Sequence, residues 1–332
     1  MFDTGIKKLI SFLEGRNNFI ISGHENPDPD AICSCIALEY LLSTIGKNAI
    51  IVNSDPIPFN LVSLDYRRKV NTVEKLSEIT NIKDYSLIIV DTNDTDNIGS
   101  IKTLINEVNS YFFIDHHSFK FEDIEHYLIL VSASSTCEVI YKLYEYFNID
   151  VPKEVGDAIY AGILFDSGSF HYPKTSSYTL QIASNIVDKG TNPNEIYLLL
   201  FEHESVESLK ILSYVVSTLE LVYNNQIAIL TLTKDMLEKS GAKYEETSIF
   251  INIPLRSHLV KACIFFKEND NGTKRVSLRS KGNIDVAKLA LNYDGGGHKN
   301  ASGFKLSGQF KEFSDAKQIV IDYIIKEIEK NK

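Results

Sequence analysis

The chain has 332 residues, which exceeds the usual single-domain length of roughly 100 to 200, so we expect two domains. Hydrophobic residues make up 44% and charged residues 23%, a globular composition that excludes a disordered or fibrous chain. The formal net charge of −10 argues against a broad basic surface for long nucleic acid. A small anionic substrate, held by metal ions and a few local cations, stays open.

The four cysteines, Cys33, Cys35, Cys137 and Cys263, form neither a CxxC pair nor a disulfide framework. We expect reduced, mostly buried thiols and a cytoplasmic location. The beginning of the chain lacks a signal-peptide core, and no apolar run reaches the roughly 18 residues that span a bilayer. Neither export nor membrane insertion is expected.

The first half of the chain alternates short apolar runs with segments of helical periodicity. Strands are predicted at residues 19–22, 49–52, 87–90, 111–114 and 128–131, with helices over 31–45, 101–108 and 136–147. This alternation is typical of an α/β fold with a doubly wound, mainly parallel sheet.

The second half begins with helical segments and returns to strands after residue 221. The sequence Gly190-Thr191-Asn192-Pro193 marks a domain edge. Strand-like runs at 226–232, 261–266 and 274–278, followed by an amphipathic stretch over 312–332, predict a smaller α+β domain whose last helix packs on its sheet. We therefore expect domains over 1–190 and 222–332, joined by a helical connector over 191–221.

Acidic and imidazole side chains follow three of the predicted strands. They are His24, Asp28 and Asp30 after the first strand, Asp91 after the third, and Asp115-His116-His117 after the fourth. Ligands of open α/β sheets bind at the carboxyl ends of the strands. An ordinary turn with Asp30 as helix N-cap would explain the first group alone. Three such strand ends instead indicate a shared ion site, because a carboxylate after apolar residues is costly unless paired, capped or metal-bound.

Asp166 follows a predicted helix in the same manner, although it could be a plain C-terminal acid, which the helix dipole disfavours. The candidate ligands are two imidazoles and four carboxylates: His24, Asp28, Asp30, Asp91, His116 and Asp166. They suffice for two divalent cations bridged by one carboxylate, and the absence of thiolate favours Mn²⁺, Mg²⁺ or Fe²⁺ over structural Zn²⁺, with Mn²⁺ as first choice. Such a pair of ions catalyses phosphoester hydrolysis.

The predicted second domain carries two segments suited to anions. One is Arg279-Ser280-Lys281, and the other is Asp294-Gly295-Gly296-Gly297-His298. A triple glycine lets backbone N–H groups approach an oxyanion, and an arginine can donate two parallel hydrogen bonds to a phosphate. A glycine-rich turn alone is weak evidence, and the arginine upstream and the histidine that follows strengthen it.

Taken in order, these motifs resemble the DHH phosphoesterases that carry a DHHA1 domain, and most closely the branch of NrnA-type oligoribonucleases and pAp phosphatases. The resemblance covers most of the chain, and it implies a DHH catalytic domain over 1–190 and a DHHA1 substrate-binding domain over 222–332. It implies that His24, Asp28 and Asp91 bind one metal ion. Asp30, Asp91, His116 and Asp166 would bind the other, with Asp91 as the bridge.

The resemblance also assigns the remaining roles. Asp91, Asp115, His116 and His117 would be the catalytic residues, with Asp115 orienting the histidine pair and His117 facing the substrate phosphate. The nucleotide would be held by Arg279, Ser280, Gly295, Gly296, Gly297 and His298. The sequence departs from the family at Pro29, where glycine is common, which predicts a stiffer loop.

The expected activity is metal-dependent hydrolysis of short oligoribonucleotides, including linear dinucleotides such as pApA, or of pAp, to mononucleotides. Hydrolysis of cyclic di-AMP is the near alternative, and a catalytically silent nucleotide sensor is the alternative from another class. The complete ligand set argues against the sensor. We expect a short nucleotide as the partner, with no long nucleic acid and no membrane, and a homodimer is compatible with the sequence.

Overall fold

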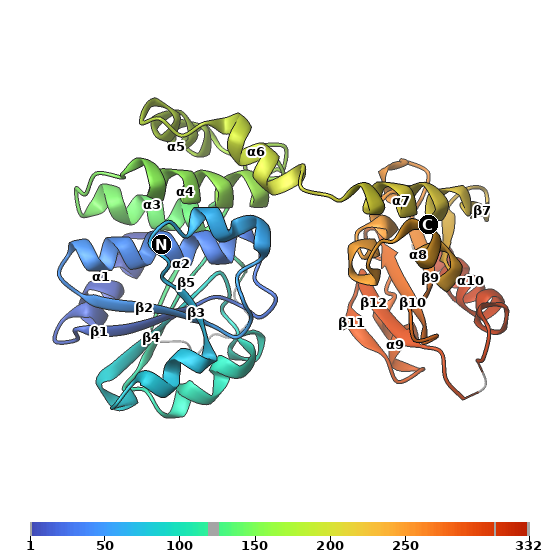
Figure 1. Cartoon of the computed structure of the whole chain (residues 1–332), viewed down its shortest axis with the longest axis horizontal. Helices are drawn as coiled ribbons and strands as arrows, with labels where there is room; N and C mark the ends of the chain where they lie inside the picture. Colours follow the sequence, from blue (N-terminus) through green and yellow to red (C-terminus); the bar gives the residue numbers. More distant parts are fainter. Residues whose placement is uncertain (1, 119–125, 309, 331–332) are drawn as a thin grey trace. The chain divides into compact units, whose positions relative to one another are not determined.

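The computed structural model describes residues 2–118, 126–308 and 310–330 (Figure 1). The chain divides into two compact units, Met1–His203 and Glu204–Lys332. Two helices occupy the expected connector, α6 (Pro193–Phe201) and α7 (Val206–Ser217). The division falls between them, so that α6 belongs to the first unit and α7 to the second.

The first unit is built on a six-stranded parallel sheet of order β3-β2-β1-β4-β5-β6. The strands are β1 (Asn18–Ser22), β2 (Asn48–Asn53), β3 (Val70–Thr72), β4 (Tyr85–Val90), β5 (Tyr111–Asp115) and β6 (Tyr127–Ile129). The predicted α/β class and all five predicted strands are confirmed, whereas the three-residue β3 was missed. The strand order reverses between β1 and β4, and ligands of open α/β sheets bind at such a switch point, beyond the carboxyl ends of the strands.

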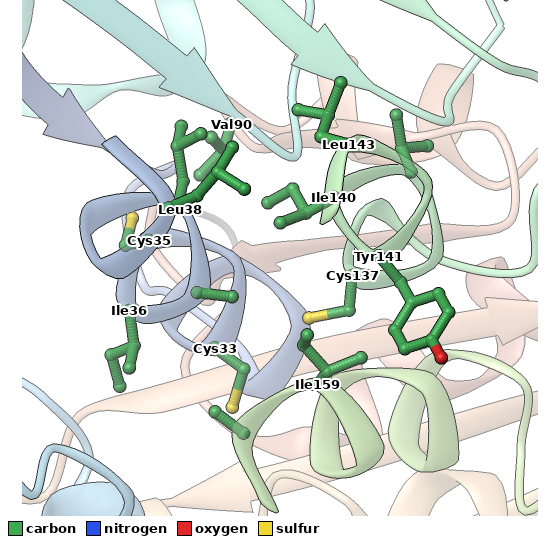
Figure 2. Packing of buried hydrophobic residues seen from close by; sticks show 14 of the residues in the cluster. Cys33, Cys35, Ile36, Leu38, Val90, Cys137, Ile140, Tyr141, Leu143 and Ile159 are labelled. Carbon is green, nitrogen blue, oxygen red and sulfur yellow. The ribbon is translucent and has the colours of Figure 1, made fainter. Parts of the chain in front are cut away.

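The described residues of this unit also form the α-helices α1 (Phe2–Leu13), α2 (Pro29–Thr44), α3 (Thr136–Tyr146), α4 (Lys153–Asp166), α5 (Ser177–Asp188) and α6. The 3₁₀ segments are η1 (Phe59–Leu64), η2 (Val73–Glu78), η3 (Ile82–Asp84), η4 (Thr95–Asn97) and η5 (Gly99–Asn106), the last in place of the α-helix predicted over 101–108. Figure 2 shows the packing of α2, α3 and α4 through Cys33, Ile36, Cys137, Ile140 and Ile159. Because α2 is buried on nearly every side, its position is fixed on all faces.

The start of α2 differs from the expected N-cap. Asp28, not Asp30, is the cap, and its Oδ1 accepts a 3.0 Å hydrogen bond from the Ala31 N–H. Pro29 occupies the first helical position, where the missing N–H removes no helix hydrogen bond and the fixed φ suits the helix. The turn and the ion-site interpretations therefore meet in one residue, since Asp28 caps the helix and also belongs to the acidic group.

The second unit contains a mixed six-stranded sheet of order β11-β12-β10-β9-β8-β7, in which only the β8–β9 pair is parallel. Its strands are β7 (Glu220–Val222), β8 (Ile227–Leu232), β9 (Ala262–Glu268), β10 (Lys274–Ser280), β11 (Gly296–His298) and β12 (Ala301–Lys305). Its helices are α7, α8 (Lys234–Ser240), α9 (Ala287–Leu291) and α10 (Phe313–Lys330), with 3₁₀ segments η6 (Tyr244–Thr247), η7 (Phe250–Asn252) and η8 (Pro254–Arg256).

The two faces of this second sheet have separate cores. Val276, Leu278 and Phe304 pack with Val320 and Ile324 of α10 on one face, which confirms the predicted role of the C-terminal helix. The other face packs against α7 and η7 over β8 and β9. The smaller α+β domain predicted from the sequence is thus confirmed.

All four cysteines are buried and free, as predicted. Within the described residues, no helix combines the length and the apolar character that a bilayer-crossing segment needs.

Gly162 of α4 generates a test of the packing in Figure 2. A Cβ atom at this position would overlap Cys137 Sγ and lie 2.7 Å from Asp30 Oδ1. We predict that Gly162→Ala lowers the free energy of unfolding by about 1 to 3 kcal/mol, the usual penalty for overpacking. Chemical denaturation would measure it. Gly296→Ala is the control, because a Cβ there meets nothing within 4 Å; equal stability of the two variants would contradict the prediction.

Candidate active site

The six predicted metal ligands lie together at the carboxyl ends of β1, β4 and β5 and the end of α4. His24, Asp28 and Asp91 form one group in which candidate ligand atoms lie within 4.8 Å of one another. A second group contains Asp30, His116 and Asp166, and a third contains Asp91, Asp115, His116 and His117. Asp91 and His116 each belong to two groups, so the groups form one continuous cluster.

Asp91 lies at the centre of this cluster. It directly follows β4, is 3% exposed and has a positive φ of 61°, an unusual conformation for a residue other than glycine. Its Oδ2 lies 3.7 Å from His24 Nε2, and its Oδ1 lies 3.7 Å from His116 Nε2. Each oxygen thus faces a different imidazole, which is the arrangement that a bridging carboxylate requires.

Asp30 is completely buried and joins α2 to the beginning of α3. Its Oδ2 accepts a 2.6 Å hydrogen bond from the Thr136 N–H, and its Oδ1 accepts one of 3.0 Å from the Cys137 N–H. Free N–H groups of a helix N-terminus stabilise a carboxylate. Because each carboxylate oxygen has two acceptor sites, both can still bind a cation.

The ring of His116 is fixed with one nitrogen directed at carboxylates. Nδ1 lies 3.3 Å from the carbonyl oxygen of Ala133; in the neutral ring, donation by Nδ1 would leave Nε2 unprotonated and able to bind a cation. Nε2 lies 2.9 Å from Asp166 Oδ2, yet it is buried without a hydrogen-bond partner of acceptable geometry. An unpartnered imidazole nitrogen among carboxylate oxygens fits a bound metal ion.

Asp115 lies under this cluster with both oxygens occupied. Oδ1 accepts hydrogen bonds from His117 Nδ1 at 2.8 Å and from the N–H groups of His116 and His117, while Oδ2 accepts one of 2.7 Å from Asn93. Asp115 therefore orients the ring of His117, whereas the ring of His116 is held by Ala133. This differs from the expectation that Asp115 orients both rings. The side chain of His117 is 55% exposed, so it is accessible to a substrate.

Three supporting residues were missed in the sequence. Asn93 holds Asp115, and the Thr136 hydroxyl donates a 2.9 Å hydrogen bond to Asp91 Oδ1. Lys174 Nζ donates to the carbonyl oxygen of His116 at 3.1 Å, which brings a cation to the edge of the cluster. Asn93 is two residues beyond Asp91 and could have been suspected, but nothing in the sequence pattern brings Thr136 or Lys174 to this site.

The crowding of carboxylates shifts their protonation. Burial, together with the charges of Asp28, Asp115 and Asp166, raises the pKa of Asp91 to about 7. Burial and the neighbouring Asp91 and Asp166 also raise the pKa of Asp30. Burial acts against a charged His24, but hydrogen bonds to Asp28 and Asp91 prevail and raise its pKa to about 11. Without cations, the cluster thus retains protons that bound metal ions would displace.

These pKa shifts predict that metal binding releases protons and that the number of protons released depends on pH. At pH 6 Asp91 is mostly protonated and must lose its proton to become a ligand, whereas at pH 8 it is mostly ionised. His24 is protonated at both values and releases its proton at both. Isothermal titration with Mn²⁺ in buffers of different ionisation enthalpy should therefore show fewer protons released at pH 8 than at pH 6. An equal or larger release at pH 8 would contradict this electrostatic description.

The central position of Asp91 generates a second prediction. Asn tolerates the positive φ of this residue but cannot supply a charged bridging oxygen. We expect Asp91→Asn to lose bound Mn²⁺ and at least about tenfold in phosphoesterase rate, with the fold retained. Metal analysis and turnover with excess Mn²⁺ are the measurements. Asp96→Asn is the control, because Asp96 is exposed and pairs with Lys102; a variant that keeps more than a tenth of the wild-type rate would refute a bridging role.

The predicted nucleotide-binding residues lie together in the second unit. Arg279 and Ser280 end β10. Gly295 directly precedes β11, which consists of Gly296, Gly297 and His298 and pairs with β12, the neighbour of β10. The half-buried Arg279 donates to its neighbouring carbonyl, that of Leu278. The Ser280 hydroxyl donates a 2.7 Å hydrogen bond to the carbonyl oxygen of Ile284, so its proton is already engaged within the loop after β10.

Comparison with known proteins agrees with this arrangement. Residues 18–163 match the model of the DHH family N-terminal domain, and residues 212–327 match that of the DHHA1 domain. The chain is 30% identical over 301 residues to the bifunctional oligoribonuclease and PAP phosphatase NrnA of Bacillus subtilis, covering 89% of this chain and 91% of that protein. The chain therefore belongs to the DHH family with a C-terminal DHHA1 domain, as predicted.

Two further proteins are similar over nearly the whole chain. The probable bifunctional oligoribonuclease and PAP phosphatase NrnA of Streptococcus mutans is 29% identical over 310 residues, covering 90% of this chain and 93% of that protein. The crystal structure of an exopolyphosphatase-related protein from Bacteroides fragilis has a TM-score of 0.84 and 25% identity, covering 98% of both chains. Both the domain order and the fold are thus shared along the full length.

Proposed function

We propose that this protein is a metal-dependent phosphoesterase that hydrolyses short oligoribonucleotides, including linear dinucleotides such as pApA, and pAp to mononucleotides. The main support is the geometry of Asp91, whose Oδ2 lies 3.7 Å from His24 Nε2 and whose Oδ1 lies 3.7 Å from His116 Nε2. The NrnA proteins named above, with that printed activity, support the same substrate class. His24, Asp28 and Asp91 would hold one cation, and Asp30, Asp91, His116 and Asp166 the other.

The proposed chemistry combines two metal ions with the imidazole of His117. Two divalent ions, Mn²⁺ by first choice and Mg²⁺ or Fe²⁺ by the same donor chemistry, would lower the pKa of a bound water and screen the phosphate charge. His117, whose pKa is raised by its hydrogen bond to Asp115, lies on the exposed side of the cluster. It can donate a hydrogen bond to a phosphate oxygen as charge develops there.

A charge count explains why further cations matter. Asp28, Asp30, Asp91 and Asp166 carry four negative charges when ionised, and two divalent ions carry four positive ones, so the loaded cluster is close to neutral. Asp115 adds a fifth negative charge, which a protonated His117 balances through their hydrogen bond. A further positive charge beside the cluster is that of Lys174, whose amine donates to the carbonyl oxygen of His116. In the second unit, Arg279 and the backbone of Gly295, Gly296, Gly297 and His298 would hold the nucleotide.

The near alternative is hydrolysis of cyclic di-AMP. The cyclic-di-AMP phosphodiesterase GdpP of Bacillus subtilis is 28% identical to the chain over 315 residues, which cover 88% of this chain but only 45% of GdpP. The two NrnA proteins match over more than nine-tenths of their own length, which favours the short linear substrates.

The free, buried thiols fit a reducing compartment, and we place the protein in the cytoplasm. A homodimer remains part of this proposal.

A substrate panel with Mn²⁺ tests the proposal. We expect release of mononucleotide from pApA and of phosphate from pAp, each at least about tenfold faster than cleavage of a 24-mer RNA, because a net charge of −10 opposes the approach of a strand that carries many phosphates. Cyclic di-AMP and pyrophosphate complete the panel. Comparable rates on pApA and the 24-mer would reject the preference for short substrates. No hydrolysis of any of these compounds would reject the enzyme itself in favour of a nucleotide sensor.

A further inference from the structure

One face of the second sheet is partly exposed along its β10–β12–β11 part, with η7 close to β10. Residues of β10 alternate, so that Val276 and Leu278 are buried against α10 while Arg275, Ser277 and Arg279 lie on the opposite face. Their cross-strand partners on β12 are Lys305, Gly303 and Ala301 in that order, and Gly296 of β11 pairs with Gly303. Ser277, Ala301, Gly303 and Gly296 are all at least partly exposed, although they lie within the sheet.

These four small residues form a flat floor. A Cβ at Gly296 would meet no described atom within 4 Å, so the space directly above this residue is free. At Gly303 a Cβ would lie 2.7 Å from the carbonyl oxygen of Val276, so backbone packing excludes a side chain there. Such a floor lets a flat or extended ligand lie directly against the backbone.

Cations lie at both ends of this floor. Arg279 is beside Ala301 at one end. At the other end Arg275 is in register with Lys305 on β12 and with Lys267 on β9, so that three basic residues occupy one row across three strands. The two ends are four residues apart along β10, or about 13 Å at roughly 3.3 Å per residue.

Lys267 is the unexpected member of this row. It is only 7% exposed, and its ammonium lies 4.3 Å from the ring centroid of Tyr244, with no hydrogen bond or ion pair to any described residue. Burial, with repulsion from Arg275 and Arg279, lowers its pKa to about 8, and the attraction of Glu245 does not offset this. A buried amine among like charges is unfavourable unless an anion approaches it.

We propose that Lys267, Arg275 and Lys305 form a second phosphate subsite, which binds a terminal phosphate of a nucleotide that lies along the floor from the Arg279 end. The inference rests on the proposed function and extends it, because it names the substrate feature that the second unit selects. An arginine fork and two amines suit the oxygens of a phosphate monoester, which carries more charge than a diester. Substrates with two phosphate groups are therefore favoured over those with one.

The test compares pApA with ApA, which lacks the terminal phosphate, using the full chain with Mn²⁺. Arg275→Gln and Lys305→Gln alter exposed residues and should raise the KM for pApA by at least about tenfold, the effect of one lost charge-assisted hydrogen bond, with the KM for ApA unchanged. Lys274→Gln is the matched control, since Lys274 is the adjacent residue of β10 and pairs instead with Glu312. Equal KM changes for pApA and ApA, or none, would overturn the subsite.

A binding measurement separates this inference from the proposed function. In EDTA, where no metal-dependent turnover occurs, calorimetry with pAp should show weaker binding to Arg275→Gln and to Lys267→Met than to the wild type and Lys274→Gln. Thermal unfolding checks that Lys267→Met keeps its fold, and Arg275→Gln carries the test if it does not. If the wild type cleaves neither dinucleotide, and Arg275→Gln binds pAp more weakly than the wild type, the proposed function is rejected and the subsite is kept. Unchanged affinity in both variants would reject the subsite alone.

Discussion

The arrangement of the first unit depends on the hydrogen bonds between the carboxylate of Asp30 and the first N–H groups of α3. Asp30 belongs to α2, the first helix after β1, whereas α3 lies more than a hundred residues further along the chain. The contact binds these two helices together at their N-termini and stabilises a buried negative charge by hydrogen bonds from a helix end. The same carboxylate lies within 4.8 Å of His116 and Asp166. One interaction thus connects helix packing to the position of the candidate ligands.

The two units solve opposite electrostatic problems. The first collects carboxylates that repel one another, so that burial and proximity raise the pKa of Asp91 and Asp30. The second collects cations on one sheet face, where the same physics lowers the pKa of Lys267. A set of like charges that the chain does not neutralise marks, in each unit, a place where an ion of opposite sign belongs. Net charge alone conceals this, because the overall value of −10 says nothing about where the charges gather.

The sequence was sufficient for the features that repeat a local pattern. Apolar runs followed by acids predicted β1, β4 and β5 and the residues at their ends, since the period of a strand and the rule for ligand positions are both local. The polar β3 lacks such a run, and the 3₁₀ segment η5 has the same periodicity as a short α-helix. Thr136 and Lys174 reach the cluster through tertiary contacts alone, and the row of Lys267, Arg275 and Lys305 depends on strand register. Register is not visible without the pairing partners.

The cysteines beside the ligand cluster have a consequence for metal selectivity. Cys137 lies against Asp30, with its Sγ 3.8 Å from the Asp30 carbonyl oxygen, and Cys33 belongs to the same packed helices. Burial and the charge of Asp30 raise the pKa of both thiols well above the ordinary value. Soft metal ions bind the thiolate and not the thiol. Sulfur is therefore present within a few ångströms of the site but chemically silent, and the cluster offers only oxygen and nitrogen to the ions that compete for it.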